Sequence, residues 1–188
     1  MTTGTQKHPN GVNVDQLVQT VNAIKSDPEL AKFNFRASTK WMGGGQSTTT
    51  IRGFYGAGKE DESRTAPFVI QGDEPPVLLG QNVGPNAVES VLQALASCLA
   101  VGFSYNAAAQ GINVKSLEFD LEGEIDLHGF LGLSEKIRPG YKGIRLTYRI
   151  DCDAAADKVE ALWKHVEKTS PVLDILRNPV DVKVQRDV

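Results

Sequence analysis

The chain has 188 residues, of which 40% are hydrophobic and 23% are charged, and its formal net charge is −3. These values are typical of a globular protein that is long enough to bury a sizeable core. Basic and acidic side chains number 20 and 23, and no run of Lys or Arg is longer than a pair. This balance gives no electrostatic reason to expect nucleic acid or an anionic membrane as a partner, so we expect a small molecule or another protein.

The cysteine content and the N-terminal residues exclude several other classes. Two cysteines, Cys98 and Cys152, are too few for a disulfide scaffold, and the three histidines make no metal-ligand spacing with them. The first residues lack the pattern of a secretory signal, and we expect no run of about 18 apolar residues that would span a bilayer. We therefore expect a cytoplasmic protein without a metal or another cofactor, with a disordered leader over residues 1–12 and a single domain over residues 13–188.

The first part of the chain predicts one helix followed by short strands. Residues 13–26 carry apolar side chains at helical spacing. Residues 33–55 are rich in β-branched and aromatic side chains on both sides of a three-glycine turn, as expected of a hairpin. After the polar segment 58–64, two further short strands are predicted at 67–71 and 77–79.

A long helix is predicted from about residue 87 to residue 110. Asn86 is a good N-cap, and Glu89 stands three residues later, as in a capping box. Gly111 fits the left-handed position that follows many helices. The helix is apolar on nearly all sides, which predicts burial on nearly all sides. Cys98 lies in its middle.

Residues 117–127 and 142–152 alternate between apolar and charged side chains, which predicts two half-buried strands of a hairpin. Arg145 and Arg149 can then lie across from the carboxylates of the first strand, and this row of carboxylates suits solvation and arginine pairing better than cation binding. The connecting loop, 128–143, is too apolar for a solvated tip, so we expect either a lid over a pocket or a contact with a second subunit.

The C-terminal part predicts two helices and a last strand. The first helix is expected over residues 154–168, and Ser170 followed by Pro171 opens a second that ends near residue 176. Alternating valines predict a strand over 180–184. The order of these elements indicates an α+β fold with mostly antiparallel sheet.

Cys98 allows two interpretations, because free cysteine is among the most frequently buried residue types but is also a potential nucleophile. Free thiols are mostly protonated at neutral pH, so a reactive Cys98 would need a nearby cation or hydrogen-bond donors. Arg36 and Arg52 are candidates for the cation, although each also suits a solvated strand position. Glu89 precedes Cys98 by about two and a half helical turns, on the opposite face, which favours a capping role.

Four motifs carry a family resemblance, and together they cover nearly the whole chain past about residue 33. They are WMGGG at 41–45, DEPPVLLG at 73–80, GPN..E....AL.SC at 84–98 and SPV at 170–172. These motifs resemble the OsmC/Ohr family of osmotically inducible and organic hydroperoxide resistance proteins. The resemblance implies an intertwined homodimer in which long central helices pack between sheets and the active sites lie at the subunit interface.

In the peroxidase members of that family, the helix cysteine attacks a hydroperoxide, and a second cysteine resolves the sulfenic acid that forms. Cys98 matches the first cysteine, but Ser170 stands in the place of the second, and serine cannot form a disulfide. Gln46 occupies the place of the activating arginine, and Val88 that of the catalytic glutamate, with Glu89 one step away.

Two hypotheses follow from the sequence. The first is a thiol-dependent hydroperoxide reductase in which Cys98 reacts in a one-cysteine cycle with an external thiol reductant, Arg36 or Arg52 stabilises the thiolate, and Ser170 donates a hydrogen bond. The second is a non-catalytic dimer that binds an apolar small molecule between the central helices and the loop 128–143. The Cys98 retained in the family motif favours the first.

Overall fold

The computed structural model describes residues 8–187. Within them the chain forms two compact units, the first from Asn13 to Val91 and the second from residues 8–12 together with 92–187. The helices and antiparallel strands confirm the predicted α+β class. The sequence predicts that residues 13–188 form a single domain. Whether the two units form one domain together stays a prediction.

The first unit contains helix α1 and two three-stranded antiparallel sheets. Helix α1 (Val14–Ser26) begins where the sequence predicts, because the Asn13 side chain accepts a hydrogen bond from the backbone N–H of Gln16. The predicted hairpin over 33–55 divides between the sheets, since its inner part pairs in one and its ends pair in the other. The sheets are β2 (Ser38–Gly43), β3 (Gln46–Ile51) and β6 (Phe68–Gly72), and β1 (Asn34–Phe35), β4 (Phe54–Gly56) and β5 (Lys59–Asp61).

Two sequence predictions in this unit are wrong. The strand predicted at 77–79 is the 3-10 helix η3 (Pro76–Leu78), because consecutive prolines remove the N–H donors that a strand needs and fix a turn geometry. Conversely, β5 lies inside the polar segment that carries no strand prediction. It pairs with β4 through a tight turn at Ala57 and Gly58, both with positive φ, the geometry of a two-residue hairpin loop.

The DEPPVLLG motif is organised by the buried carboxylate of Asp73. This carboxylate accepts hydrogen bonds from the backbone N–H groups of Glu74, Gln81 and Val83 at 2.8, 2.9 and 3.2 Å. Burial raises the pKa of Asp73, but these donors favour the charged form and hold the pKa below its ordinary value overall. The motif therefore has a structural role, which is to fix the loop that leads to α2.

Helix α2 (Ala87–Ala109) begins in the first unit and continues through the second. Its start confirms the predicted capping box, since the Asn86 backbone N–H donates to the Glu89 carboxylate and the Glu89 N–H donates to the Asn86 side chain. Its end confirms the predicted left-handed glycine, with φ of +71° at Gly111. The second unit further contains β7 (Val114–Gly123), α3 (Leu127–Phe130), β8 (Ile144–Cys152), α4 (Ala156–Thr169) and α5 (Pro171–Arg177).

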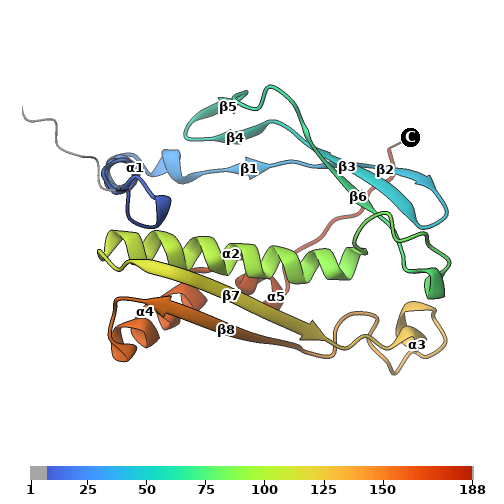
Figure 1. Ribbon diagram of the computed structural model, residues 1–188. Coiled ribbons are helices and arrows are strands. Elements are labelled where there is room, and N and C mark those ends of the chain that lie inside the picture. Colours follow the sequence, from blue (N-terminus) through green and yellow to red (C-terminus); the bar gives the residue numbers. More distant parts are fainter. Residues whose placement is uncertain (1–7, 188) are drawn as a thin grey trace, which may run out of the picture. The chain divides into compact units, whose positions relative to one another are not determined.

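The core of the second unit lies between the β7–β8 hairpin and the helices α2 and α4 (Figure 1). The Trp163 ring of α4 lies at its centre, 4.1 Å from Tyr148 of β8 and 5.9 Å from both Phe103 of α2 and Phe119 of β7, measured between ring centroids. Fully burying one such side chain contributes on the order of 1.5–3 kcal/mol. This aromatic cluster therefore fixes α4 against α2 and the hairpin.

Helix α2 is less buried in this chain than its composition predicts. Its buried side chains lie on the core side, whereas Val101 is 52% exposed and Tyr105 is 46% exposed. Among the described residues, α2 is also long and apolar enough by length and composition to cross a bilayer, a property that core helices of soluble proteins share. The buried residues are Leu95, Leu99, Phe103, Ala107 and Ala108.

The β7–β8 hairpin confirms the predicted pairing of arginines with carboxylates, but its first strand ends at Gly123, and Leu127 begins α3 instead of ending the strand. Glu118 lies opposite Arg149, and Glu122 lies opposite Arg145. Arg145 forms ion pairs with Glu122 and the neighbouring Glu124, while Arg149 pairs with Glu118 and Asp120. All of these side chains are exposed, so each pair is worth little by itself, but together they satisfy the outer face of the hairpin.

The loop 128–143 is anchored at its base by Asp126. Its carboxylate accepts hydrogen bonds from the His128 ring and from Lys142, and these partners lower the pKa of Asp126 to about 2. Further along, Phe130 is 67% exposed and Leu133 is 69% exposed. The apolar loop that the sequence predicts to need cover is thus uncovered in the part of the chain that the structure describes.

The last strand predicted from the sequence is not formed. Val180, Val182 and Val184 are exposed, and no strand among the described residues pairs with them. An alternating sequence makes a strand only where a neighbouring strand can accept its backbone hydrogen bonds. The alternating valines alone were therefore not enough to form a strand.

Residues 8–12, at the end of the predicted disordered leader, are ordered, whereas residues 1–7 lie outside the described residues. The Asn10 side chain explains this order, because it donates to the carbonyl of Ile112 at 2.9 Å and accepts from the N–H of Val114 at 2.8 Å. Val12 is 9% exposed. The leader prediction is corrected for this segment, which holds the connection between α2 and β7.

Replacing Asn10 by alanine is expected to lower the free energy of unfolding by about 2 kcal/mol, since it leaves two partly buried backbone groups without partners. Asn10 also has φ of +56°, which asparagine tolerates better than alanine. Chemical denaturation monitored by tryptophan fluorescence measures the change. Asn22→Ala on the exposed side of α1 is the matched control, and equal stability of the two variants would contradict the assigned role.

Candidate functional site

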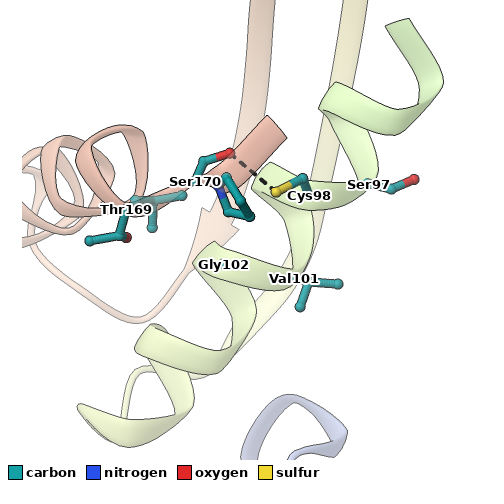
Figure 2. A pocket seen from close by; sticks show the side chains of 8 residues that line it. Ser97, Cys98, Val101, Gly102, Thr169 and Ser170 are labelled. Carbon is teal, nitrogen blue, oxygen red and sulfur yellow. Dashed lines mark hydrogen bonds between the residues drawn. The ribbon is translucent and has the colours of Figure 1, made fainter. Parts of the chain in front are cut away.

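Cys98 and Ser170, two of the residues singled out from the sequence, lie side by side in the second unit. The Cys98 sulfur, on α2, is 3.2 Å from the Ser170 Oγ, between α4 and α5, and Figure 2 shows the two side chains pointing toward each other. This is hydrogen-bond distance for a sulfur atom, and either atom can be the donor. Cys98 is half-buried, so it is neither sealed in the core nor fully solvated.

Ser170 is one of the few buried polar side chains, at 5% exposure. It confirms the predicted N-cap role, because its Oγ accepts the backbone N–H of Leu173 at 3.3 Å and Pro171 follows at the first helical position. The same oxygen therefore faces the helix α5 and the Cys98 sulfur. The polar requirements of Ser170 are met without water, which fixes its hydroxyl in place.

A cavity of about 440 Å³ opens beside the Cys98 sulfur. Its wall is largely apolar and carries no charged side chain. Gly102 contributes to this geometry, because a Cβ at that position would come within 3.2 Å of the Val166 side chain, closer than most such contacts. The glycine thus allows α2 and α4 to approach beside the thiol. The lining residues are Ser97, Cys98, Val101, Gly102, Val166, Thr169, Ser170 and Pro171.

The sequence reasoning missed most of this lining. Val101 and Gly102 follow Cys98 by about one helical turn, so a helical projection from the cysteine could have found them. Val166 and Thr169 come from α4 and approach α2 only through tertiary packing, for which the sequence gives no signal.

The two candidate cations belong to the first unit, whereas Cys98 and Ser170 belong to the second. Arg36 forms a surface ion pair with Glu60, and the backbone carbonyl of Arg52 accepts a hydrogen bond from the Arg64 guanidinium. The role of either arginine as a partner of the thiolate stays a prediction. Glu89 forms the capping box of α2, and its candidacy as a catalytic residue stays a prediction.

Cys98 and Cys152 are both free thiols in the structure. Cys152 ends β8, opposite Val114, and packs against the core cluster. The loop 128–143 does not line this cavity, and the predicted binding site between that loop and the central helices of a dimer stays a prediction. Among the described residues there is no group of three or more side chains that could hold a metal ion.

The fold and the site define a class of α+β proteins in which a cysteine on a long helix meets the N-cap of a short C-terminal helix. The family model for OsmC-like proteins matches residues 80–185, more than half of the chain, and includes Cys98 and Ser170. The chain therefore belongs to the OsmC-like protein family, which confirms the resemblance seen in its motifs.

Solved structures support the same fold at low sequence identity. An OsmC-like protein from Mycoplasma pneumoniae is 16% identical, with a TM-score of 0.58 over 78% of this chain and 89% of its own. An OsmC-like protein of unknown function from Vibrio cholerae is 12% identical, with a TM-score of 0.57 over 75% and 92%. An organic hydroperoxide resistance protein OsmC from Legionella pneumophila is 19% identical, with a TM-score of 0.53 over 80% and 93%. No curated protein matches the sequence.

The geometry predicts that Ser170→Cys will form a disulfide with Cys98 after treatment with one equivalent of an organic hydroperoxide. The 3.2 Å between sulfur and oxygen exceeds the roughly 2.05 Å of a disulfide bond by about 1 Å, a gap that the longer C–S bond of a cysteine and a small side-chain rotation can close. Intact mass and peptide mapping measure the crosslink. Thr169→Cys is the matched control, because the Thr169 hydroxyl donates to the His165 carbonyl instead. An uncrosslinked Ser170→Cys variant would contradict the observed approach of the two helices.

Proposed function

We propose that the protein is a thiol-dependent hydroperoxide reductase in which Cys98 is the reacting residue of a one-cysteine cycle. The observation that carries the proposal is the Cys98 sulfur, half-buried beside an open, largely apolar cavity and 3.2 Å from a buried hydroxyl. A packing cysteine would need neither the cavity nor the polar partner. The description of the Legionella protein as an organic hydroperoxide resistance protein supports the same class of substrate.

The proposed reaction begins with the Cys98 thiolate and the outer oxygen of a hydroperoxide. Sulfur supplies two electrons, an S–O bond forms and the O–O bond breaks, and the alkoxide leaves and takes up a proton to become an alcohol. The product on the protein is a sulfenic acid. One molecule of an external thiol then attacks the sulfenic sulfur and releases water, and a second displaces Cys98 from the mixed disulfide, so that the reductant leaves as a disulfide.

An external reductant closes the proposed one-cysteine cycle, because the Ser170 hydroxyl cannot supply electrons to the sulfenic acid. We propose that the protein acts in the reducing cytoplasm, where small and protein-bound thiols are abundant. Arg36 or Arg52 is the proposed source of positive charge near the thiolate. That charge would raise the fraction of reactive thiolate at neutral pH.

A second candidate is a non-catalytic protein that binds an apolar small molecule. It is favoured by the cavity wall, where Val101, Val166 and Pro171 supply apolar surface without a charged group. In this candidate Ser170 only caps α5, and Cys98 only packs. The two candidates differ in whether Cys98 reacts with peroxide.

The first test is oxidation of the reduced protein by an organic hydroperoxide. We expect stoichiometric sulfenic acid or mixed disulfide at Cys98, formed at least about tenfold faster than oxidation of a free thiol, since a thiol without thiolate-stabilising partners is mostly protonated at neutral pH. Stopped-flow kinetics with intact-mass analysis measures this rate, and Cys98→Ser is the control. A Cys98 that oxidises no faster than a free thiol would sink the reductase proposal and leave the binding candidate, which displacement of an apolar fluorescent probe then tests.

We also propose that the protein is a homodimer, because the core helix leaves Val101 and Tyr105 exposed and the loop 128–143 leaves Phe130 and Leu133 exposed. Large apolar side chains that a single chain leaves exposed are candidates for burial in an interface. Sedimentation velocity at micromolar concentration is expected to give a species of about twice the chain mass, and a glutamate at Tyr105 is expected to shift it toward the monomer. A single monomeric species over the whole range of concentration would contradict the dimer.

A further inference from the structure

We infer that Ser170 is a positioning residue, which donates its O–H to the Cys98 sulfur and keeps the reactive side of that sulfur turned toward the cavity. The inference deepens the proposed function, because it gives a role to the serine that stands where the peroxidase members carry a second cysteine. The inference rests on the proposed function only in the claim that this hydrogen bond assists the reaction of Cys98 with a hydroperoxide. The hydrogen bond itself can be tested on the thiol without any peroxide.

The hydrogen bonds of Ser170 fix the direction of donation. A hydroxyl has one proton and two lone pairs. The backbone N–H of Leu173 already donates to the oxygen at 3.3 Å, so one lone pair is used while the proton stays available. A thiolate at Cys98 has no proton of its own and can only accept. In the reactive state, therefore, the hydroxyl donates and the sulfur accepts across the 3.2 Å contact.

Burial makes this hydrogen bond effective. Ser170 is 5% exposed, so water has little access to the oxygen and competes weakly for its proton. No charged side chain lines the cavity, and the Ser170 hydroxyl is the one polar group with a hydrogen bond to the sulfur among the described residues. A hydrogen bond to a charged acceptor is stronger than one between neutral groups. The serine hence favours the thiolate over the thiol.

The same contact also decides the side from which an oxidant can approach. At 3.2 Å the sulfur and the hydroxyl oxygen are in direct contact, so no further oxygen atom fits between them. The cavity lies beside Cys98 and is lined by Val101 and Gly102 of α2 and, far from them in the sequence, by Thr169 and Pro171. The S–O bond therefore forms toward the cavity. The sulfenic oxygen then lies in the space through which an external thiol arrives.

Three substitutions at position 170 separate hydrogen-bond donation from helix capping. Ser170→Thr keeps the hydroxyl and the cap, Ser170→Gly keeps most of the capping ability but has no hydroxyl, and Ser170→Ala loses both. The probe is iodoacetamide, with the rate of Cys98 alkylation read between pH 5 and pH 10 by mass analysis of the labelled peptide. The unfolding temperature of each variant measures how much the loss of the N-cap of α5 destabilises the protein.

We expect the threonine variant to alkylate like the natural protein. The glycine and alanine variants should both alkylate on the order of tenfold more slowly at pH 7, the loss expected for one hydrogen bond to a charged atom. Only alanine should lower the unfolding temperature clearly. Ser104→Ala is the control, because that hydroxyl lies on the same helix and donates to the Val101 carbonyl.

Two results would overturn the inference. Unchanged alkylation profiles in the glycine and alanine variants would show that the hydroxyl does not donate to the sulfur. If the alkylation profile shifts in Ser170→Ala but not in Ser170→Gly, the alkylation rate depends on the capping of α5 and not on the hydroxyl. Ser170 would then have only a structural role. Because the readout is alkylation, either result is independent of whether the protein reduces hydroperoxides, so failure of the proposed function is seen separately.

Discussion

The apolar inner face of the β7–β8 hairpin is the constraint on which the second unit depends. A two-stranded hairpin is at best marginally stable alone in water, so this face must be covered. Helices α2 and α4 supply the cover, and Trp163 contacts side chains of β7, β8 and α2. With α4 fixed in this way, its C-terminal end reaches α2 at Cys98. The site is therefore a consequence of how the core is packed.

Elements with strong local signals could be predicted from the sequence. The alternation of β7 and β8, the capping box at Asn86 and Glu89, and the glycine at 111 each express one physical rule, and each is formed as expected. The wrong predictions arise where strand pairing or turn geometry outweighs the local pattern of apolar and polar residues. β5 forms in a polar segment because a tight turn lets it pair with β4, whereas the valines at 180–184 have the pattern of a strand and no partner.

The candidate site was predictable in identity but not in arrangement. The motifs single out Cys98 and Ser170, yet the two are far apart in the sequence and only the packing of α4 on α2 brings them within 3.2 Å. The cavity depends on the same packing, since Val166 and Thr169 carry no signal of their own. For Arg36 and Arg52, the sequence gave a suitable residue type but no distance to Cys98. Both arginines belong to the first unit, whereas Cys98 belongs to the second.

Position 170 must satisfy two demands at once, and serine answers them differently from cysteine. Helix α5 has only seven residues, so it relies on its N-cap, and serine is among the best residues at that place. A cysteine there could return electrons to an oxidised Cys98, whereas a serine can only donate a hydrogen bond. Under the proposed function, the serine would donate a hydrogen bond to the reacting sulfur and would leave reduction of the oxidised sulfur to a thiol from outside. Both demands fall on one buried oxygen atom, which accepts the Leu173 N–H and lies 3.2 Å from the Cys98 sulfur.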